Sequence, residues 1–523
     1  MKTHAFLSVG VFVTQLVLAA TQCVPQSFKD LSLPGGQILT VEAEVLTNLS
    51  ANVLMPTNYY PRNITGLDVC QVLVQYTHPG QNDTLNVNIW LPLENWNGRY
   101  MATGGGGFAA GSGITQLYIP ASLGYVTSFT DGGHNISTGG TAPWALVSPG
   151  NVNWVLLNDF ARIAYNDMAT ISKSAAALFY GSPPKYSYWS GCSTGGRQGH
   201  QMAQSYPTQF DGILATSSAF NWAHFLVMEY WPTFVMNSLN IHPTPCELAT
   251  LVELATTACD GLDGVIDGII ANPGLCFFDA QTVVNQTFNC SDTGEEMQIS
   301  QGAATVIEAL WTGPRTVDGK FQWFGLNKDA SYAGISNVTC NDNGTCEASP
   351  FTIAMDWIQR FVLKNTTINL LDLSHSDWDT IFRASVDQYE SVISANNPDL
   401  TDFRNHGGKM ITYHGLADQL IPPNGTYNYY ERVLQQDPNA ADFYRFFPVP
   451  GLAHCGGGPG WYPGDAMEAL VAWTEKGIVP DTLLARTTPT AETPARTIQL
   501  CAYPKVLRYV GGDINIVSSF TCE

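Results

Sequence analysis

The feature that most constrains the fold of this chain is a Gly-x-Ser-x-Gly pentapeptide at residues 191–195. A β-rich run at 186–189 precedes it, and a predicted helix over 196–206 follows it. A serine placed between a strand and a helix needs a sharp turn, and the flanking glycines relieve the crowding at such a turn. This context predicts that the Ser193 hydroxyl projects above a sheet, rather than lying in an ordinary Gly/Ser-rich turn.

A base and an acid for this serine are expected downstream, because a serine is a weak nucleophile until a base takes its proton. Asp418 lies in a loop directly after a predicted strand at 409–413, and His454 lies in a Gly-rich loop ahead of a predicted helix near 466–476. The order serine, acid, histidine is that of α/β-hydrolases. We therefore predict a catalytic triad of Ser193, Asp418 and His454.

Other histidines compete for the role of base. His414 is the strongest competitor, but it lies in the same loop as the predicted acid. Weaker candidates are His134, His375 and His406.

Two cysteines stand beside the predicted nucleophile and base. Cys192 precedes Ser193, and Cys455 follows His454. If the serine and the histidine share a hydrogen bond, these cysteines come within the Cα separation of roughly 4.4–6.8 Å that a disulfide needs. We predict a Cys192–Cys455 bridge; the alternative is that each cysteine pairs elsewhere.

The oxyanion of a tetrahedral intermediate needs two amide donors. The amide of Thr194, at the start of the predicted helix, is one. The other is expected from the glycine-rich loop at 104–107, where we favour Gly105 or Gly106. A phosphate-binding loop is disfavoured because no Gly-Lys-Ser/Thr follows.

The pattern of strand, turn and helix signals changes along the chain. Short β-rich runs, glycine turns and helical stretches mark 65–225 and resume at 400–523, whereas 226–399 carries cysteines, glycosylation sequons and few strand signals. This predicts an α/β-hydrolase fold interrupted by a large inserted domain. The expected boundaries are a signal peptide at 1–20, the first part of the hydrolase domain at 21–225, the insertion at 226–399, and the second part at 400–523.

The first twenty residues indicate secretion. Lys2 and His4 precede an apolar run that ends in small residues at Ala19 and Ala20, as in a signal peptide. A membrane anchor is the alternative, but the run is short and polar residues interrupt it, and no later segment is apolar for long enough to span a membrane. We expect an extracellular protein with no membrane partner.

Covalent features agree with an oxidising, extracellular destination. The chain has 12 cysteines, an even number. We also predict glycosylation at the Asn-x-Ser/Thr sequons, which begin at Asn48, Asn63, Asn82, Asn135, Asn285, Asn289, Asn337, Asn343, Asn365 and Asn424.

The charge balance is acidic: Lys plus Arg number 23 and Asp plus Glu 44, for a net charge of −21. Nucleic acids and anionic membranes require a basic patch, so neither is expected as a partner. Solubility in an acidic exterior explains the acidity better than attraction of a cationic partner does.

The motif residues also carry a family resemblance. The segment 191–199, with Tyr413-His414-Gly415 through Asp418 and with His454-Cys455, resembles the fungal tannase and feruloyl esterase family, and feruloyl esterase B in particular. The likeness runs from about Cys23 to Cys522. It implies a bridge between the two active-site cysteines and a lid domain that holds a calcium ion.

The segment that matches the calcium site is the glycine-rich loop at 259–269. Calcium takes six to eight oxygen ligands, and clustered carboxylates repel one another without a cation. The spacing is not that of an EF-hand, so a solvated acidic turn is the alternative. On the resemblance we assign a structural calcium, and no organic cofactor, to the side chains of Asp260, Asp263 and Asp267 and the carbonyls of Val265 and Ile269.

Further disulfides follow from the resemblance and from position. The resemblance implies Cys23–Cys70 and Cys501–Cys522. Cys259 and Cys276 flank the predicted calcium loop and are expected to pair, and Cys340 and Cys346 would close a small loop. Cys246 and Cys290 are left over, and only elimination pairs them.

The resemblance implies an enzyme that hydrolyses carboxylic esters of aromatic acids through an acyl-enzyme. Feruloyl esterases release hydroxycinnamic acids from plant cell-wall carbohydrate, and tannases act on galloyl esters. We favour the feruloyl esterase, because tannases tend to carry Asp and Glu at the positions of Thr194 and Gln198. Aromatic residues at the start of the insertion could line the acid pocket or form core: Phe220, Trp222, Tyr230, Trp231 and Phe234.

Two other classes are weighed. One is a catalytically inactive carbohydrate-binding or adhesion glycoprotein on the same scaffold, and the intact triad argues against it. The other is a peptidase, because the same triad cleaves amides; nothing in the sequence indicates a peptide-binding cleft.

Overall fold

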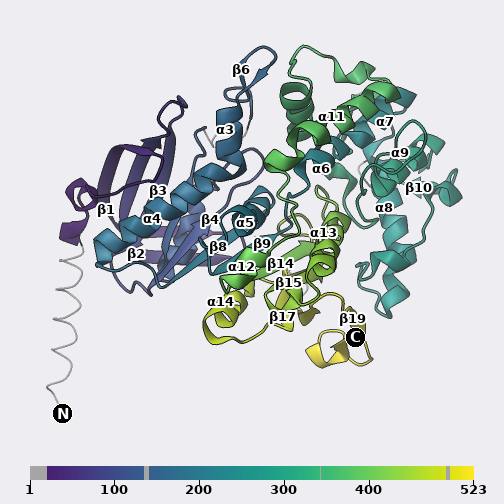
Figure 1. Cartoon of the computed structure of the whole chain (residues 1–523). Coiled ribbons are helices and arrows are strands. Elements are labelled where there is room, and N and C mark those ends of the chain that lie inside the picture. Colours follow the sequence, from purple (N-terminus) through teal and green to yellow (C-terminus); the bar gives the residue numbers. More distant parts are fainter. Residues whose placement is uncertain (1–19, 135–139, 292, 342, 490–494) are drawn as a thin grey trace. The chain divides into compact units, whose positions relative to one another are not determined.

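A computed structural model describes residues 20–134, 140–291, 293–341, 343–489 and 495–523 (Figure 1). All but the last residue of the predicted signal peptide, and the sequon at Asn135, lie outside the described residues. The chain divides into two compact units, each assembled from separate segments. Unit 1 comprises Met1–Gly139, Asn153–Ala215 and Leu400–Met410, and unit 2 comprises Gly140–Val152, Thr216–Asp399 and Ile411–Glu523.

Unit 1 is built on a mixed β-sheet with strand order β1-β2-β3-β5-β4-β8-β9. Strands β1, β2, β3 and β5 pair antiparallel, whereas β4 pairs parallel with both β5 and β8. The parallel strands are short and almost fully buried, as strands covered on both faces are. Their bounds are β1 Gln37–Val53, β2 Arg62–Thr77, β3 Leu85–Pro92, β4 Arg99–Thr103, β5 Val126–Thr130, β8 Tyr186–Cys192 and β9 Gly212–Thr216.

Helices cover this sheet. The longest is α4 (Ala164–Tyr180), which packs against β3, β4 and β5 and ends at Gly181, where a left-handed φ of 77° suits glycine (Figure 1). A π-helical turn, η4 (Asp159–Ile163), joins α3 (Trp154–Asn158) to α4. The remaining helices of unit 1 are α2 Tyr118–Ser122, α5 Thr194–Ser205 and α12 Thr401–Asn405.

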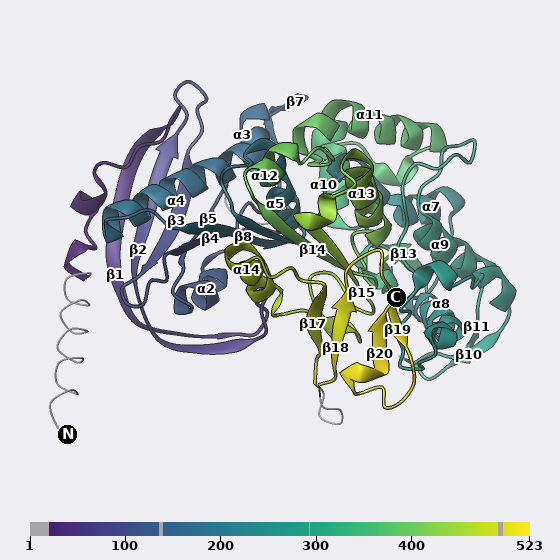
Figure 2. The ribbon, with the colours of Figure 1, turned by 60° about the horizontal axis from the view of Figure 1, so that its bottom comes forward.

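Unit 2 combines sheet strands with a helical region. In it β14 (Lys409–Gly415) and β15 (Tyr444–Val449) belong to one sheet, and β16, β17 and β18 form a separate antiparallel sheet beside the hairpin of β19 and β20 (Figure 2). Both β9 and β14 cross from one unit to the other. The larger elements are α6 Trp222–Met228, α7 Trp231–Leu239, α8 Pro245–Cys259, α9 Gln301–Thr312, α10 Thr352–Asp356, η9 Trp357–Val362, α11 His375–Ile393, α13 Pro423–Gln436, β16 Trp461–Tyr462, α14 Ala466–Lys476, β17 Thr482–Thr487, β18 Thr497–Cys501, β19 Leu507–Tyr509 and β20 Phe520–Cys522.

The helical region at 216–399 has well-capped helices and an aromatic core. Thr244 and Glu247 form a capping box at the start of α8, and Ser374 and Asp377 form one at the start of α11. The five aromatic residues predicted to be either pocket or core are all at most 7% exposed. They are core: ring contacts join Trp231 to Phe234 and connect four of the five to Trp357, Trp378 and Tyr429. The Tyr230 hydroxyl donates to the Leu370 carbonyl at 3.3 Å.

Most predicted elements are confirmed. The runs at 186–189 and 409–413 lie in β8 and β14, and the helix near 466–476 is α14. The long strand β1 was not predicted. The compact units do not coincide with the predicted domains, because residues 411–523 group with the helical region, and the hydrolase and lid boundaries stay a prediction. No described helix is long and apolar enough to cross a membrane.

Candidate active site

Ser193 occupies the turn between β8 and α5 in unit 1. Its φ of 61° and ψ of −124° lie in a region that residues other than glycine rarely adopt, and such strain is typical of functional sites. The first intrahelical bond of α5 runs from the Arg197 amide to the Ser193 carbonyl, at 3.0 Å. The Thr194 amide therefore precedes the helical hydrogen bonds, as the first amides of a helix do.

The glycines around Ser193 are required by close packing. A Cβ on Gly191 would lie 2.5 Å from the Gly195 carbonyl, and one on Gly104 would lie 2.5 Å from the Gly195 Cα. A Cβ on Gly195 itself would lie 3.1 Å from the Gly105 carbonyl oxygen. The turn and the glycine-rich loop thus touch through their backbones, which explains why glycine recurs at these positions.

The glycine-rich loop is bonded to α5. The Gly195 amide donates to the Gly105 carbonyl at 3.0 Å, and the Thr194 hydroxyl donates to the Gly107 carbonyl at 2.6 Å. The amides predicted to hold the oxyanion already have protein acceptors: Gly105 donates to Gln198 Oε1 at 3.0 Å and Gly106 to the Ala109 carbonyl at 3.2 Å. An oxyanion would have to compete with these acceptors, so the role of either glycine stays a prediction.

Two side chains of the segment 191–199, for which the sequence indicated no structural role, hold this region together. Arg197 is 0% exposed, and its guanidinium donates to the carbonyls of Phe160 and Ala161 at 3.1 and 3.0 Å. Gln198 is also fully buried; besides accepting from Gly105, it donates to the Tyr165 hydroxyl at 2.7 Å. One signal for these two residues was available in the sequence: an arginine and a glutamine stand directly inside a glycine-rich motif, at positions that face the sheet.

Asp418 and His454, the predicted acid and base, form a pair in unit 2. His454 Nδ1 lies 2.8 Å from Asp418 Oδ2, and the amides of Leu420 and Ile421 each donate to Asp418 Oδ1 at 2.9 Å. Asp418 is fully buried. Burial alone would raise its pKa, but the charge of His454 and hydrogen bonds from His414 and His454 lower the pKa of this carboxyl well below its usual range. Asp418 is thus an anion that orients His454.

His414 supports the acid and is not the base. Its Nδ1 lies 2.7 Å from the Thr426 hydroxyl, and its Nε2 lies 3.1 Å from the Ile421 carbonyl and 3.2 Å from Asp418 Oδ2. The carbonyl and the carboxylate can only accept, so Nε2 carries the proton and Nδ1 accepts from Thr426. His414 is fully buried with both ring nitrogens occupied.

The weaker candidate bases lie elsewhere. His134 is buried between the Phe108 and Gly132 carbonyls, His375 binds the Arg315 carbonyl, and His406 is exposed.

The predicted calcium loop presents three carboxylates, but each has a partner within the protein. Asp260 Oδ1 accepts the Asp267 amide at 3.1 Å, and Asp263 Oδ1 accepts the Val265 amide at 2.9 Å. Arg496 pairs with Asp267 at 3.1 Å. Burial first, and then the neighbouring carboxylates, raise the pKa of Asp263; burial raises the pKa of Asp267 against the charge of Arg496. These oxygen donors are of the kind that calcium takes, and a cation would relieve their repulsion.

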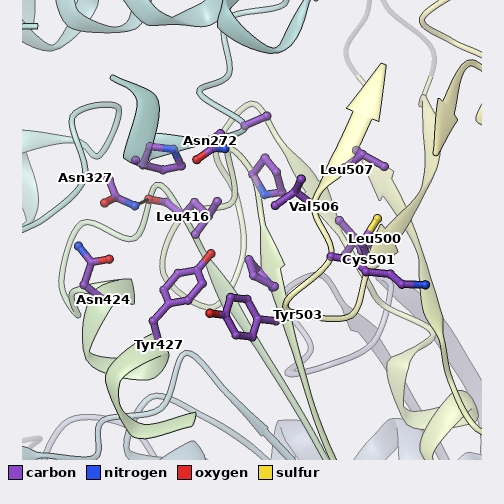
Figure 3. A pocket seen from close by; sticks show the side chains of 16 residues that line it. Asn272, Asn327, Leu416, Asn424, Tyr427, Leu500, Cys501, Tyr503, Val506 and Leu507 are labelled. Atoms are coloured by element: carbon purple, nitrogen blue, oxygen red, sulfur yellow. Dashed lines mark hydrogen bonds between the residues drawn. The ribbon is translucent and has the colours of Figure 1, made fainter. Parts of the chain in front are cut away.

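A cavity of about 300 Å³ in unit 2 reaches the loop that carries Asp418 (Figure 3). The Tyr427 and Tyr503 rings form an edge contact at 5.4 Å in its wall, and Asn327 donates to the Leu416 carbonyl at 2.8 Å. Asn424, a predicted glycosylation site, also lines it. The triad residues do not line this cavity, so we assign it no part in the chemistry.

Four predicted disulfides are present within the units: Cys23–Cys70, Cys259–Cys276, Cys340–Cys346 and Cys501–Cys522. A fifth, Cys246–Cys290, joins the two cysteines whose pairing the sequence left to elimination. The predicted Cys192–Cys455 bridge would link the two units and stays a prediction. Of the nine described sequon asparagines, Asn337 is half-buried and the others are exposed, so all are accessible to glycans.

A serine on a strand-to-helix turn, and a histidine bound to a buried aspartate, are each features typical of serine hydrolases on an α/β fold. Comparison with known proteins agrees with this class. The sequence profile of the family described as "Tannase and feruloyl esterase" matches residues 70–523. The chain belongs to this family of ester hydrolases.

Individual relatives and structures cover nearly the whole chain. A probable feruloyl esterase of Arthroderma benhamiae is 38% identical over 504 residues, which are 95% of this chain and 93% of that protein. A tannase of Aspergillus oryzae is 26% identical over 575 residues, covering 100% and 96%. The structure of the tannin acyl hydrolase from Aspergillus niger superimposes with a TM-score of 0.85 at 27% identity, covering 97% of this chain and 94% of that one.

Proposed function

We propose that this ester hydrolase is a secreted serine esterase with an α/β-hydrolase fold, which releases hydroxycinnamic acids of the ferulic type from plant cell-wall carbohydrate. The observation that carries the chemistry is the hydrogen bond between His454 and the buried, anionic Asp418, in a chain whose Ser193 sits on a strained strand-to-helix turn. The choice of acyl group is supported by the greater identity to the feruloyl esterase relative, 38% against 26% for the tannase.

In the proposed mechanism, Ser193 Oγ attacks the ester carbonyl and His454 Nε2 takes its proton. His454 Nδ1–H donates to Asp418, which stabilises the imidazolium that forms. The Thr194 amide stabilises the oxyanion, and the imidazolium then protonates the leaving alcohol. Water, activated by the same histidine, releases the acid from the acyl-enzyme.

This mechanism requires the two halves of the site to meet. A Cys192–Cys455 disulfide would hold the residue before Ser193 against the residue after His454, so the pairing belongs to the proposal. The helical region would act as a lid. A structural calcium held by the loop at 260–269 would stabilise the lid by neutralising its carboxylates, and would take no part in the chemical steps.

Tannase activity is the second candidate, because the superposition with tannin acyl hydrolase covers almost the whole chain at a TM-score of 0.85. The structure also weakens one argument against it. Gln198 is buried and hydrogen-bonded to Gly105 and Tyr165. The residue type at position 198 therefore serves the packing of α5 against the glycine-rich loop, and it does not indicate which acid is bound. The substrate must therefore be settled by assay.

The test is hydrolysis of methyl ferulate, methyl caffeate and methyl gallate by the full-length protein. Ser193→Ala is the inactive control, and Ser205→Ala, at the exposed end of α5, is the matched active control. Cleavage of the hydroxycinnamates alone supports the proposal. Preference for gallate would identify a tannase, and equal activity of Ser193→Ala would overturn the assigned nucleophile.

The same experiment separates the other classes. A carbohydrate-binding glycoprotein without catalysis would hydrolyse none of the three esters. A peptidase is separated by adding the corresponding amides, which it would cleave in preference to the esters and in a serine-dependent way. Secretion is tested by N-terminal sequencing of the protein recovered from culture medium, which should begin near residue 21.

A further inference from the structure

A buried cluster of ionisable side chains lies in unit 1, away from the triad residues. It is formed by His78, directly after β2, by Asp83 in the turn before β3, and by Asp159 at the first position of η4. One ligand atom from each of the three lies within 4.8 Å of the other two. We call these residues the His78 cluster. Among the described residues, this is the one set of His, Cys, Asp or Glu side chains that meets this geometry.

Asp159 is the unexplained member. It is 0% exposed, and neither carboxylate oxygen has a hydrogen-bond partner among the described residues. A buried carboxylate without partners carries a large desolvation cost, and native proteins rarely leave one uncompensated. Because its oxygen lies within 4.8 Å of ligand atoms of His78 and Asp83, the side chain is directed into the cluster. The Asp159 carboxylate therefore needs an additional, positively charged partner.

The other members are held in place by hydrogen bonds. His78 Nδ1 lies 2.5 Å from Asp83 Oδ2, and His78 Nε2 lies 3.0 Å from Asp167 Oδ2. The His78 amide and the Thr77 hydroxyl both donate to Asp83 Oδ1 at 2.8 Å. All the cluster members are at most 8% exposed, and Asp167 is 4% exposed. One imidazole thus faces three buried carboxyl groups, so a protonated His78 alone does not balance them when all three are ionised.

We propose that the His78 cluster binds a divalent transition-metal ion, with His78, Asp83 and Asp159 as ligands and Asp167 as either a fourth ligand or the hydrogen-bond partner of His78. A nitrogen donor together with carboxylate oxygens suits Zn²⁺ or Mn²⁺, whereas Ca²⁺ takes oxygen donors alone. Binding through a ring nitrogen displaces the proton on that nitrogen, which is released to solvent. The site is distinct from the calcium loop proposed at 260–269, which lies in unit 2.

The cluster is connected to the nucleophile through one short chain of contacts. Asp159 begins the π-helical turn, and the carbonyls of the next two residues, Phe160 and Ala161, accept hydrogen bonds from Arg197. Arg197 lies on α5, the helix that Ser193 precedes. A metal at the cluster would fix the π-turn to the β2–β3 turn. It would thereby hold in place the two carbonyls that bind Arg197, while taking no part in the chemistry.

The proposal is tested on the full-length protein, stripped with a chelator, desalted, and incubated with Zn²⁺ alone or Mn²⁺ alone. Metal retained after a second desalting is measured by mass spectrometry, and the melting temperature is recorded with and without metal. Asp159→Asn removes one ligand at nearly constant volume, and Asp30→Asn, at an exposed position of unit 1, is the matched control.

The wild type and Asp30→Asn should retain one equivalent of metal and melt about 2–5 °C higher with it. Asp159→Asn should lose both responses. Retention of no transition metal by the wild type, or equal retention by Asp159→Asn, would overturn the proposal. The same holds if metal-free Asp159→Asn simply melts higher than the wild type and neither binds metal, because Asp159 would then be held protonated.

Failure of Asp159→Asn to fold would not decide the question. Co²⁺ added to the stripped wild type provides an answer without a variant, because a His/carboxylate site gives visible ligand-field absorption bands that Zn²⁺ then abolishes. Absence of such bands would count against the site. Neither readout depends on the esterase substrate, so the outcome is independent of the proposed function.

Discussion

At the scale of single residues, the predicted acid, Asp418, is distinguished by the number of hydrogen-bond donors around its carboxylate. Asp418 receives two backbone amides and faces two histidines, and it is fully buried. Only His454 is partly exposed, with 12% of its side chain accessible. We therefore expect the two histidines to have different tasks: His454 would exchange protons with substrate, and His414 would keep the carboxylate anionic.

His414→Gln tests this division. Removing the Nε2–H donor makes the Asp418 anion less favourable, so the pKa of Asp418 rises and the carboxylate becomes a weaker partner for His454. We expect kcat to fall about tenfold with little change in KM. His406→Gln, at an exposed site, is the control. A loss of stability with an unchanged kcat would show that His414 only fills space.

Glu229 provides a second test of buried charge. Burial raises the pKa of Glu229 well above its usual value of 4.5, and the nearby Asp418 carboxylate adds to the shift. The folded protein keeps this proton where the unfolded chain has lost it, so the free energy of unfolding falls as pH rises above about 4.5. Gln cannot ionise and escapes this loss.

Glu229→Gln should therefore gain stability over the wild type as pH rises from about 4 to about 7, by on the order of 1 kcal/mol or more. Denaturant midpoints of both proteins across that range measure the difference. A difference that stays constant with pH would mean that Glu229 ionises normally in the folded protein.

At the scale of elements, the site depends on backbone contact between α5 and the glycine-rich loop. Gly104→Ala places a Cβ 2.5 Å from the Gly195 Cα, whereas Gly106→Ala meets nothing within 4 Å. We expect Gly104→Ala to cost about 1–3 kcal/mol of stability and most of the activity, because the loop must move away from α5. Gly106→Ala keeps its amide and should be close to the wild type. Equal effects of the two substitutions would contradict this account.

The elements show where sequence reasoning succeeds and where it stops. The turn at Ser193 and strands such as β14 were predictable, because short-range pattern and glycine placement specify them. The bond from Gln198 to the Gly105 amide was not, since it joins residues 93 positions apart. Nor was the His78 cluster: His78 is near Asp83 in sequence, but only the packing of α4 on the sheet brings Asp159 to them.

At the scale of the whole molecule, the calcium proposal predicts a stability effect separate from catalysis. Removing Ca²⁺ with a selective chelator should lower the melting temperature by several degrees, while the Ser193-dependent rate at 25 °C stays within about twofold. Asp263→Asn should abolish the response to calcium. An unchanged melting temperature would favour the solvated acidic turn as the correct interpretation of the loop.

The whole-molecule division was the least predictable level. Composition separated 226–399 from its flanks, and the break in the units at 215–216 lies close to that boundary. The grouping of 411–523 with the helical region depends on contacts made by the strands from β15 through β20. No local sequence pattern encodes these contacts. The predicted roles of the triad rest on both units, so the assignment of function needed the family as well as the fold.

The spacing of the disulfides has a consequence for how the chain matures. The described bridges join cysteines 47, 44, 17, 6 and 21 residues apart, and their loops never cross. Each can therefore close soon after its second cysteine emerges during synthesis. If Cys192 pairs with Cys455 as predicted, it must wait while six other cysteines emerge and pair among themselves. Maturation of this protein then depends on an oxidoreductase that resolves premature bridges to Cys192, and its yield in a heterologous host should follow that enzyme's supply.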